Sequence, residues 1–233
     1  CAMLQGFGTV LRAVRRSASQ LPRREFLTNP TLAGLDLDHR ETLAAVSQQG
    51  REIWAHFDRT LRHHEWHPFV CADYDAVLDA LFALRSPGLR MLEWGSATGV
   101  ITIMADLLGY EAYGIELDES LVAISRKLAI QYHSNARFVA GSFLPAGYVW
   151  RPRDGDGRPG TVGEGPSGYL QLGLSLEDFD LVYAFPWGGE EAMMHDLMRM
   201  HGRPGAGLCL ARTSGGVELF RDGKLERSWP RTS

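Results

Sequence analysis

The chain has 233 residues, a formal net charge of -4 and 45% hydrophobic residues, which is enough apolar material for a sizeable core. The mild negative charge argues against a dedicated nucleic-acid surface, and no apolar run reaches the length of a transmembrane segment. The three cysteines, Cys1, Cys71 and Cys209, form neither a disulfide framework nor a C-x-x-C pair. This cysteine usage suits a reducing compartment and predicts a cytoplasmic location.

Residues 1–70 are predicted to form a helical appendage or cap. Residues 3–16 are apolar and then basic, which fits a helix docked on the rest of the chain or a basic amphipathic helix in peripheral contact with a membrane. Apolar residues at helical spacing predict one amphipathic helix over 40–62. The histidine-rich stretch 63–67 is interpreted as a polar helix end, because adjacent histidines point in different directions on a helix; no metal site is predicted.

Residues 71–233 are predicted to form one α/β domain, because strand and helix patterns alternate as in a parallel sheet covered by helices. Asp73 is placed to cap a helix that ends before Pro87-Gly88. Short apolar runs predict strands at 89–94, 111–116, 136–140, 181–185 and 207–212, and helices are expected at 99–109, 118–131 and 189–201.

Two segments depart from this alternation. Residues 146–168 contain seven glycines and three prolines, so the insertion 146–177 is predicted to be an irregular loop, either disordered or a lid over the carboxyl edge of the sheet. Within 213–233, Asp222-Gly223 lies between alternating residues and predicts a β-hairpin. Only residues 213–216 separate the predicted strand at 207–212 from the strand that begins at Val217. A parallel crossover needs roughly a dozen residues, so the strand at Val217 must return antiparallel to the strand at 207–212.

The segment from Met91 to Gly99 reads MLEWGSATG, and Glu116 follows at the tip of the next predicted strand. Glycines let a turn bend sharply and approach a ligand, and a carboxylate at a strand end can accept hydrogen bonds from both ribose hydroxyls. The pair predicts a nucleotide-type cofactor pocket; the alternative is a buried turn without a ligand. Val100 stands where the dinucleotide fingerprint G-x-G-x-x-G requires its third glycine. This difference disfavours the binding of a pyrophosphate.

This arrangement of an acid, two glycines and Glu116 resembles the first two motifs of the class I S-adenosylmethionine-dependent methyltransferases, with Ala97 at the family's middle glycine. The resemblance covers roughly residues 70–212. It implies a Rossmann-like, doubly wound, mostly parallel α/β sheet, here with an antiparallel C-terminal hairpin and a helical N-terminal cap. It also implies methyl transfer from S-adenosyl-L-methionine to a small molecule or protein side chain, with S-adenosyl-L-homocysteine as the product.

The resemblance implies that the cofactor lies against strand ends. Glu93 is expected at the ammonium end of its methionine, Glu116 at the ribose and Leu117 beside the adenine. Ser142 stands where the family often has an acid near the adenine amino group. The full set of implied cofactor residues is Glu93, Gly95, Ser96, Ala97, Thr98, Gly99, Glu116, Leu117, Ser142, Phe143 and Phe185.

Glu190 and His195 are candidate catalytic bases, required only if the acceptor arrives protonated; the alternative is that the acid simply occupies the positive end of a helix. In members of this family that methylate nucleobase amines, the residue at the position of Phe185 accepts a hydrogen bond from the target amine. Phe185 cannot accept one, which disfavours nucleic-acid methylation. Two other functions stay open: a non-catalytic module that binds S-adenosylmethionine or S-adenosylhomocysteine, and, less favoured, an NAD(P)-dependent oxidoreductase. The sequence identifies neither the acceptor nor an oligomeric state.

Overall fold

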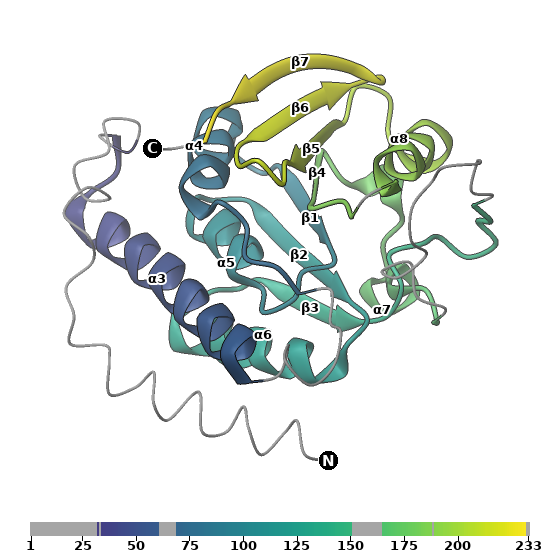
Figure 1. Cartoon of the computed structure of the whole chain (residues 1–233). Coiled ribbons are helices and arrows are strands. Elements are labelled where there is room, and N and C mark those ends of the chain that lie inside the picture. The colour runs from purple at the N-terminus through teal and green to yellow at the C-terminus, as the bar shows by residue number, and fades with distance from the viewer. Residues whose placement is uncertain (1–31, 33, 61–68, 151–164, 188, 232–233) are drawn as a thin grey trace.

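The computed structural model describes residues 32, 34–60, 69–150, 165–187 and 189–231 (Figure 1). The predicted membrane-contacting segment 3–16 and the histidine-rich stretch 63–67 lie outside these residues, as does the central part of the predicted insertion.

The described helices are α3 (Leu37–Thr60), α4 (Tyr74–Leu84), α5 (Val100–Leu107), α6 (Glu119–Gln131), α7 (Gly168–Leu172) and α8 (Glu190–His201), with a 3-10 turn η2 (Leu176–Asp178). The strands are β1 (Arg90–Trp94), β2 (Glu111–Glu116), β3 (Arg137–Ala140), β4 (Leu181–Ala184), β5 (Gly207–Ala211), β6 (Val217–Arg221) and β7 (Lys224–Trp229).

These strands form one seven-stranded sheet in the order β3-β2-β1-β4-β5-β6-β7. The first five strands pair in parallel, β6 pairs antiparallel to β5, and β7 pairs antiparallel to β6. The Rossmann-like α/β fold and the antiparallel return of the C-terminal hairpin are therefore confirmed. The strand order reverses beside β1, whose neighbours are β2 on one side and β4 on the other, and open α/β sheets bind ligands at such a switch point.

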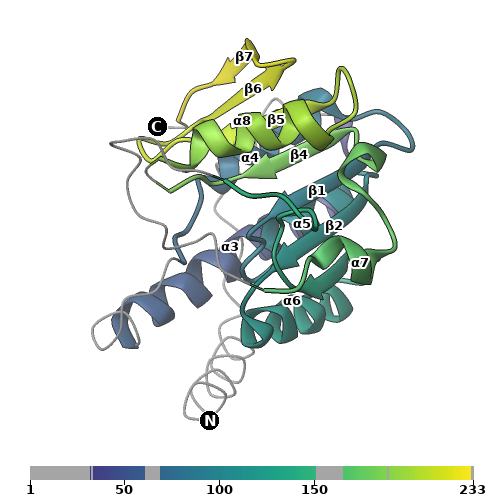
Figure 2. The ribbon, with the colours of Figure 1, turned by 90° about the vertical axis from the view of Figure 1, so that its right-hand side faces the viewer.

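Alternate residues of the strands face two hydrophobic layers. Met91 and Leu181 pack into the layer covered by α4, α5 and α6, whereas Leu92 and Val182 pack into the layer beneath α7 and α8 (Figure 2). The long helix α3 lies outside α5 (Figure 1), and its Phe57 belongs to the same buried cluster as the first layer. The described part of the predicted cap, α3, is thus packed onto the core of the sheet.

Helix α4 begins as the sequence indicates, because the carboxylate of Asp73 accepts a hydrogen bond from the amide of Ala76 at 3.3 Å. Within the predicted irregular insertion, however, the structure contains α7 and η2. The glycine and proline content of this segment indicated an irregular loop, so α7 was not predicted. The helix is held by a tertiary contact, in which the hydroxyl of Tyr169 accepts a hydrogen bond from Trp94 Nε1 at 2.8 Å. Local propensity does not report such a contact.

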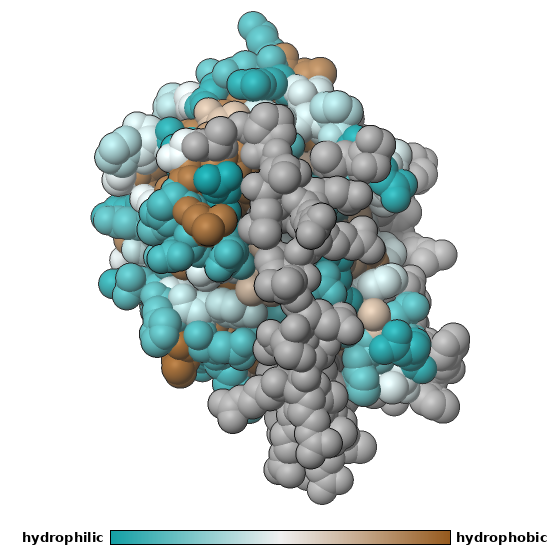
Figure 3. Space-filling view, turned by 90° about the vertical axis from the view of Figure 1, so that its left-hand side faces the viewer, coloured by the Kyte–Doolittle hydropathy of each residue, from teal (hydrophilic) through white to brown (hydrophobic). Residues whose placement is uncertain are grey.

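The face shown in Figure 3 is mostly hydrophilic where described residues are visible, with small separate hydrophobic spots. Among the helices that the structure describes, none has both the length and the apolar character that crossing a bilayer requires.

Candidate functional site

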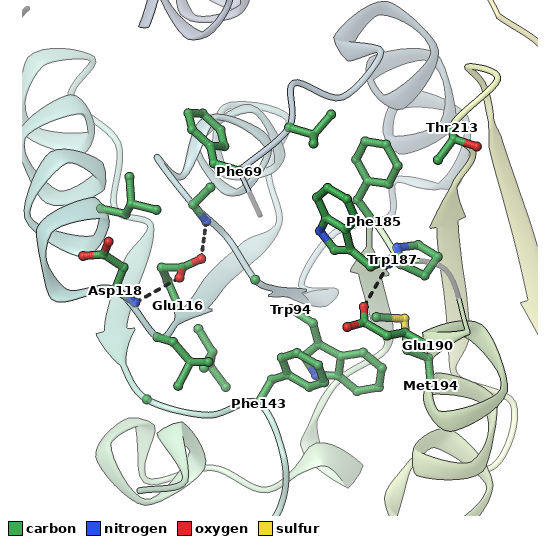
Figure 4. Close-up of a pocket in the computed structure, with 18 residues that line it drawn as sticks. Phe69, Trp94, Glu116, Asp118, Phe143, Phe185, Trp187, Glu190, Met194 and Thr213 are labelled. Carbon is green, nitrogen blue, oxygen red and sulfur yellow. Dashed lines mark hydrogen bonds between the residues drawn. The ribbon is translucent and has the colours of Figure 1, made fainter. Parts of the chain in front are cut away.

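A pocket of about 430 Å³ opens at the carboxyl edge of β1, β2, β3 and β4 (Figure 4). This is the switch point of the sheet, where the crevice between diverging connections can accept a ligand. The residues that line it are Phe69, Val70, Trp94, Gly95, Ala97, Ile115, Glu116, Leu117, Asp118, Leu121, Gly141, Phe143, Phe185, Pro186, Trp187, Glu190, Met194 and Thr213.

The turn between β1 and α5 forms one wall of the pocket. The amides of Gly95 and Ser96 both donate to the carbonyl of Ile115, at 2.9 and 3.0 Å, which fixes the turn against β2. Gly95, Ala97 and Gly99 have positive φ angles of 68°, 44° and 74°. A left-handed backbone conformation favours glycine, and Ala97 adopts this conformation despite its Cβ.

Glu116 is held in place by the backbone on both of its oxygens. Its Oε2 accepts a hydrogen bond from the amide of Ala97 at 2.8 Å, and its Oε1 accepts one from the amide of Asp118 at 3.0 Å (Figure 4). Burial raises the pKa of this carboxyl, while hydrogen bonds from the backbone amides of Asp118, Ala97 and Leu117 act in the opposite direction. The two oxygens of a carboxylate have four lone pairs between them, so Glu116 retains acceptor capacity for a ligand.

Aromatic and aliphatic side chains form the floor of the pocket. The rings of Trp94 and Phe143 stack with their centroids 5.3 Å apart, and Trp94 is fixed further by its hydrogen bond to Tyr169. Leu117, the residue that follows β2, also lines the pocket. The result is a flat, apolar surface beside a carboxylate, a combination that suits the base and ribose of a nucleoside.

A smaller cavity of about 40 Å³ adjoins this pocket and shares Trp94 and Gly95 with it. Its lining includes two buried hydroxyls, Ser96 Oγ and Tyr183 OH, which have no hydrogen-bond partner among the described residues. Buried polar groups normally have partners. The two hydroxyls are therefore available to a polar ligand group or water.

Glu93 also lines the smaller cavity and is 5% exposed. Its Oε2 accepts hydrogen bonds from the backbone amide of Thr102 at 2.9 Å and from the hydroxyl of the same residue. Burial raises the pKa of Glu93 to about 8, although these hydrogen bonds act to lower it. A cation placed beside this carboxyl would favour its ionised form.

Glu190 lies across the large pocket from Glu116 and is 6% exposed (Figure 4). Its Oε2 accepts a hydrogen bond from the amide of Trp187 at 2.9 Å, whereas its Oε1 is buried without a partner among the described residues. Burial raises the pKa of this carboxyl. Glu190 therefore brings an unsatisfied acceptor to the pocket.

His195 lies on α8 but does not line the pocket. Its ring packs edge-on against Phe220, with centroids 4.6 Å apart, and its Nε2 is 3.8 Å from Glu191. Of the two candidate bases, the structure therefore brings only Glu190 to the pocket.

The predicted cofactor residues fall into three groups. Those in the large pocket are Gly95, Ala97, Glu116, Leu117, Phe143 and Phe185, and those that line only the smaller cavity are Glu93, Ser96 and Thr98. Gly99 and Ser142 line neither: Gly99 is the N-cap of α5, and Ser142 accepts a hydrogen bond from the amide of Leu144 at 3.2 Å.

Trp94, Asp118 and Trp187 line the pocket, although none of them belongs to the predicted set of cofactor residues. Trp94 follows Leu92 by two positions on β1, so strand alternation indicated that both face the same layer. Its part in the pocket floor depends on the stack with Phe143, which no local pattern reveals. No group of three or more histidine, cysteine or acidic side chains is positioned to hold a metal ion in the described part of the chain.

The fold and the site define a doubly wound α/β protein with a nucleoside-sized pocket at the switch point of its sheet. No family model matches the sequence, and a search of curated proteins finds no relative.

Solved structures share part of the chain path at low identity. A precorrin-6y C5,15-methyltransferase from Geobacter metallireducens is 16% identical over 58% of this chain and 59% of its own, with a TM-score of 0.41. An RNA methyltransferase from Salinibacter ruber in complex with S-adenosyl-L-homocysteine is 17% identical over 66% of this chain and 90% of its own, with a TM-score of 0.43. A SAM-dependent methyltransferase from Thiobacillus denitrificans, also in complex with S-adenosyl-L-homocysteine, is 18% identical over 69% of this chain and 54% of its own, with a TM-score of 0.42.

This chain spans 59% and 51% of the first two structures found.

Proposed function

We propose that this protein binds S-adenosylmethionine and transfers its methyl group to a small molecule or a protein side chain. The observation that carries the proposal is the geometry of Glu116. The backbone amides of Ala97 and Asp118 hold its carboxylate at the end of β2, and its remaining acceptor capacity suits the hydroxyls of a ribose.

The other cofactor residues fit the rest of the molecule. Leu117 and Phe143 offer apolar surface to the adenine. The smaller cavity offers Glu93, Ser96 and Tyr183 to the polar end of the methionine, where a carboxylate suits an ammonium and the unpartnered hydroxyls suit a carboxylate. When bound, S-adenosylmethionine supplies an electrophilic methyl group on a sulfonium.

The protein's own contribution is binding, orientation and exclusion of water. A fixed carboxylate and apolar walls hold two reactants in one geometry, which lowers the entropic part of the barrier. Glu190 is the candidate base for an acceptor that arrives protonated, since its Oε1 has no other partner among the described residues. His195 is a weaker candidate because it does not line the pocket.

A dinucleotide cofactor is disfavoured by the charge of the site. Three carboxylates, those of Glu116, Asp118 and Glu190, line the large pocket, and its described lining includes no lysine or arginine. A pyrophosphate would meet like charges without a cationic partner. The glycine pattern, which lacks the third glycine of the dinucleotide fingerprint, supports the same conclusion.

Calorimetric titration with S-adenosylhomocysteine tests the proposal, with NADH titrated in parallel. We expect micromolar binding, weakened about tenfold or more in Glu116→Ala through loss of charge-assisted hydrogen bonds. Glu119→Ala is the matched control, because Glu119 is exposed on α6 and does not line the pocket. Absence of S-adenosylhomocysteine binding by the wild-type protein would overturn the proposal.

A module that binds the cofactor without catalysis predicts the same titration. The two functions separate when label from methyl-labelled S-adenosylmethionine is followed into candidate acceptors. Transfer that depends on Glu116 supports an enzyme, and binding without transfer to any acceptor supports the module.

A further inference from the structure

Resting on the proposed function, we infer that the methyl acceptor is an arylalkyl amine, an amine on a short chain that carries an aromatic ring, and that Glu190 binds its ammonium group at the end of the pocket formed by β4 and α8. Glu190 also takes the proton that the ammonium must lose before its nitrogen can accept the methyl group. Three features of this end carry the inference: an unsatisfied carboxylate oxygen, an absence of cationic side chains from the described lining, and aromatic walls.

The first feature is the buried oxygen of Glu190. Its Oε2 is satisfied by the amide of Trp187, but its Oε1 has no partner among the described residues. Figure 4 shows the side chain directed toward the interior of the pocket from the start of α8. A buried acceptor without a donor is costly, so a ligand that brings an N–H group into reach gains that interaction.

The second feature is the charge of the surroundings. The described lining of the large pocket contains acidic side chains but no lysine, arginine or histidine. The nearest basic group along the chain from Thr213 is Arg212, which forms ion pairs with Glu191 and Glu218. An anionic acceptor has no counter-charge here, whereas a cation compensates Glu190.

The third feature is the shape and chemistry of the walls. Phe185 and Trp187 follow β4 and line the pocket together with Phe143 and Met194 (Figure 4). Aromatic faces attract cations and pack against rings. The sulfonium of the cofactor is also attracted to aromatic faces, but its charged sulfur carries no hydrogen and cannot donate a hydrogen bond to Glu190. An ammonium group can.

The test uses the full chain saturated with S-adenosylhomocysteine and three probes that share one body: phenethylamine, phenethyl alcohol and hydrocinnamate. A second set consists of tryptamine, tryptophol and indolepropionate. Binding is followed by calorimetry for both sets and, for the phenyl probes, also by tryptophan fluorescence, since Trp94 and Trp187 line the pocket. We expect at least one amine to bind about tenfold or more tightly than its alcohol, and neither acid to bind.

Glu190→Gln should remove this preference for the amine, and its affinity for S-adenosylhomocysteine is measured alongside so that every probe is titrated into the saturated protein. Glu191→Gln is the matched control, because Glu191 is the next residue on α8 and faces Arg212 instead of the pocket. It should keep the preference. Thermal unfolding of each variant separates loss of binding from loss of folding.

Three results would overturn the inference: amines that bind no more tightly than the alcohols, no amine binding at millimolar concentration, or a preference that survives in Glu190→Gln. Butylamine reproduces the end of a lysine side chain without a ring, and binding as tight as that of phenethylamine would overturn the assignment of an aromatic body. Failure of S-adenosylhomocysteine itself to bind contradicts the proposed function, whereas normal S-adenosylhomocysteine binding without amine preference contradicts this inference alone.

Discussion

The backbone amide of Ala97 donates a hydrogen bond to Oε2 of Glu116 at 2.8 Å. The glycine-rich turn after β1 and the acid that ends β2 are therefore one structural unit. The turn fixes the direction of the carboxylate, and the carboxylate in turn stabilises a backbone conformation in which Ala97 has a φ of 44°. A change on either side of this contact affects the other.

Ala97→Gly should preserve the contact and relieve the strain of a Cβ in the left-handed region. We expect the free energy of unfolding to rise by up to about 1 kcal/mol, since relief of strain outweighs the added flexibility of glycine in the unfolded chain. Affinity for S-adenosylhomocysteine should stay the same or increase. Urea unfolding and calorimetry provide the two measurements.

Ala123→Gly is the control for this substitution, because Ala123 lies within α6 and has no positive φ. It should lower stability by about 1 kcal/mol. If Ala97→Gly were as destabilising as the control, the strain assigned to Ala97 would be wrong.

Gly95 and Gly99 have similar φ angles but different surroundings, which makes them a matched pair. A Cβ on Gly95 meets nothing within 4 Å, whereas one on Gly99 lies 2.5 Å from the ring of Phe138 and 2.6 Å from the Cβ of Ser125. Gly95→Ala should cost about 1–2 kcal/mol of unfolding free energy from backbone strain alone. Gly99→Ala should cost roughly 1–3 kcal/mol more from overpacking.

Chemical denaturation of the two alanine variants gives this difference directly. Equal losses would mean that Phe138 and Ser125 move aside at little cost, and that Gly99 is required only for its backbone conformation.

The ends of most elements were predictable because local signals agree with the tertiary fold. Asp73 caps α4, β2 has the predicted bounds, and Asp222-Gly223 forms the hairpin turn. Turn and capping residues act through contacts a few positions away, so a sequence reports them directly.

The composition of the site was less predictable because its parts come from distant segments. Glu116 was evident from its place at a strand end. The stacking of Trp94 on Phe143 joins β1 to the segment after β3, and the unpartnered Oε1 of Glu190 is defined by what surrounds it. Neither property has a local sequence signal.

Tyr169→Phe should destabilise the protein by about 1–3 kcal/mol, because the indole N–H of Trp94 loses its buried acceptor. Tyr148→Phe is the control: its hydroxyl donates to Asp196 at 2.9 Å in a less buried setting, and its loss should cost less. Tryptophan emission should also change in Tyr169→Phe. Similar losses in the two variants would contradict a structural role for the contact between α7 and β1.

Glu93 should make stability depend on pH. Its pKa is about 8 in the folded protein against an ordinary value of 4.5, so the folded state holds a proton that the unfolded state has lost over this interval. The contribution to stability is complete below about pH 4.5 and is lost as the pH rises through about 8, by a few kcal/mol in all.

Urea unfolding of wild type and Glu93→Gln across this range isolates the effect, because the other titrating groups are common to both proteins. The difference between the two profiles should change through the interval and level off above about pH 8. Parallel profiles would show that the pKa of Glu93 is close to its ordinary value.

Cofactor binding should release a proton from the same carboxyl. If the ammonium end of S-adenosylhomocysteine lies beside Glu93, its positive charge lowers the pKa of the carboxyl, which then ionises near neutral pH. Calorimetric heats measured in two buffers with different ionisation enthalpies should therefore differ for wild type and agree for Glu93→Gln. Equal heats for the wild-type protein would place the ammonium away from the smaller cavity, while binding itself would still support the role of Glu116. The two ends of the cofactor are in this way tested by separate residues: Glu116 through affinity and Glu93 through proton release.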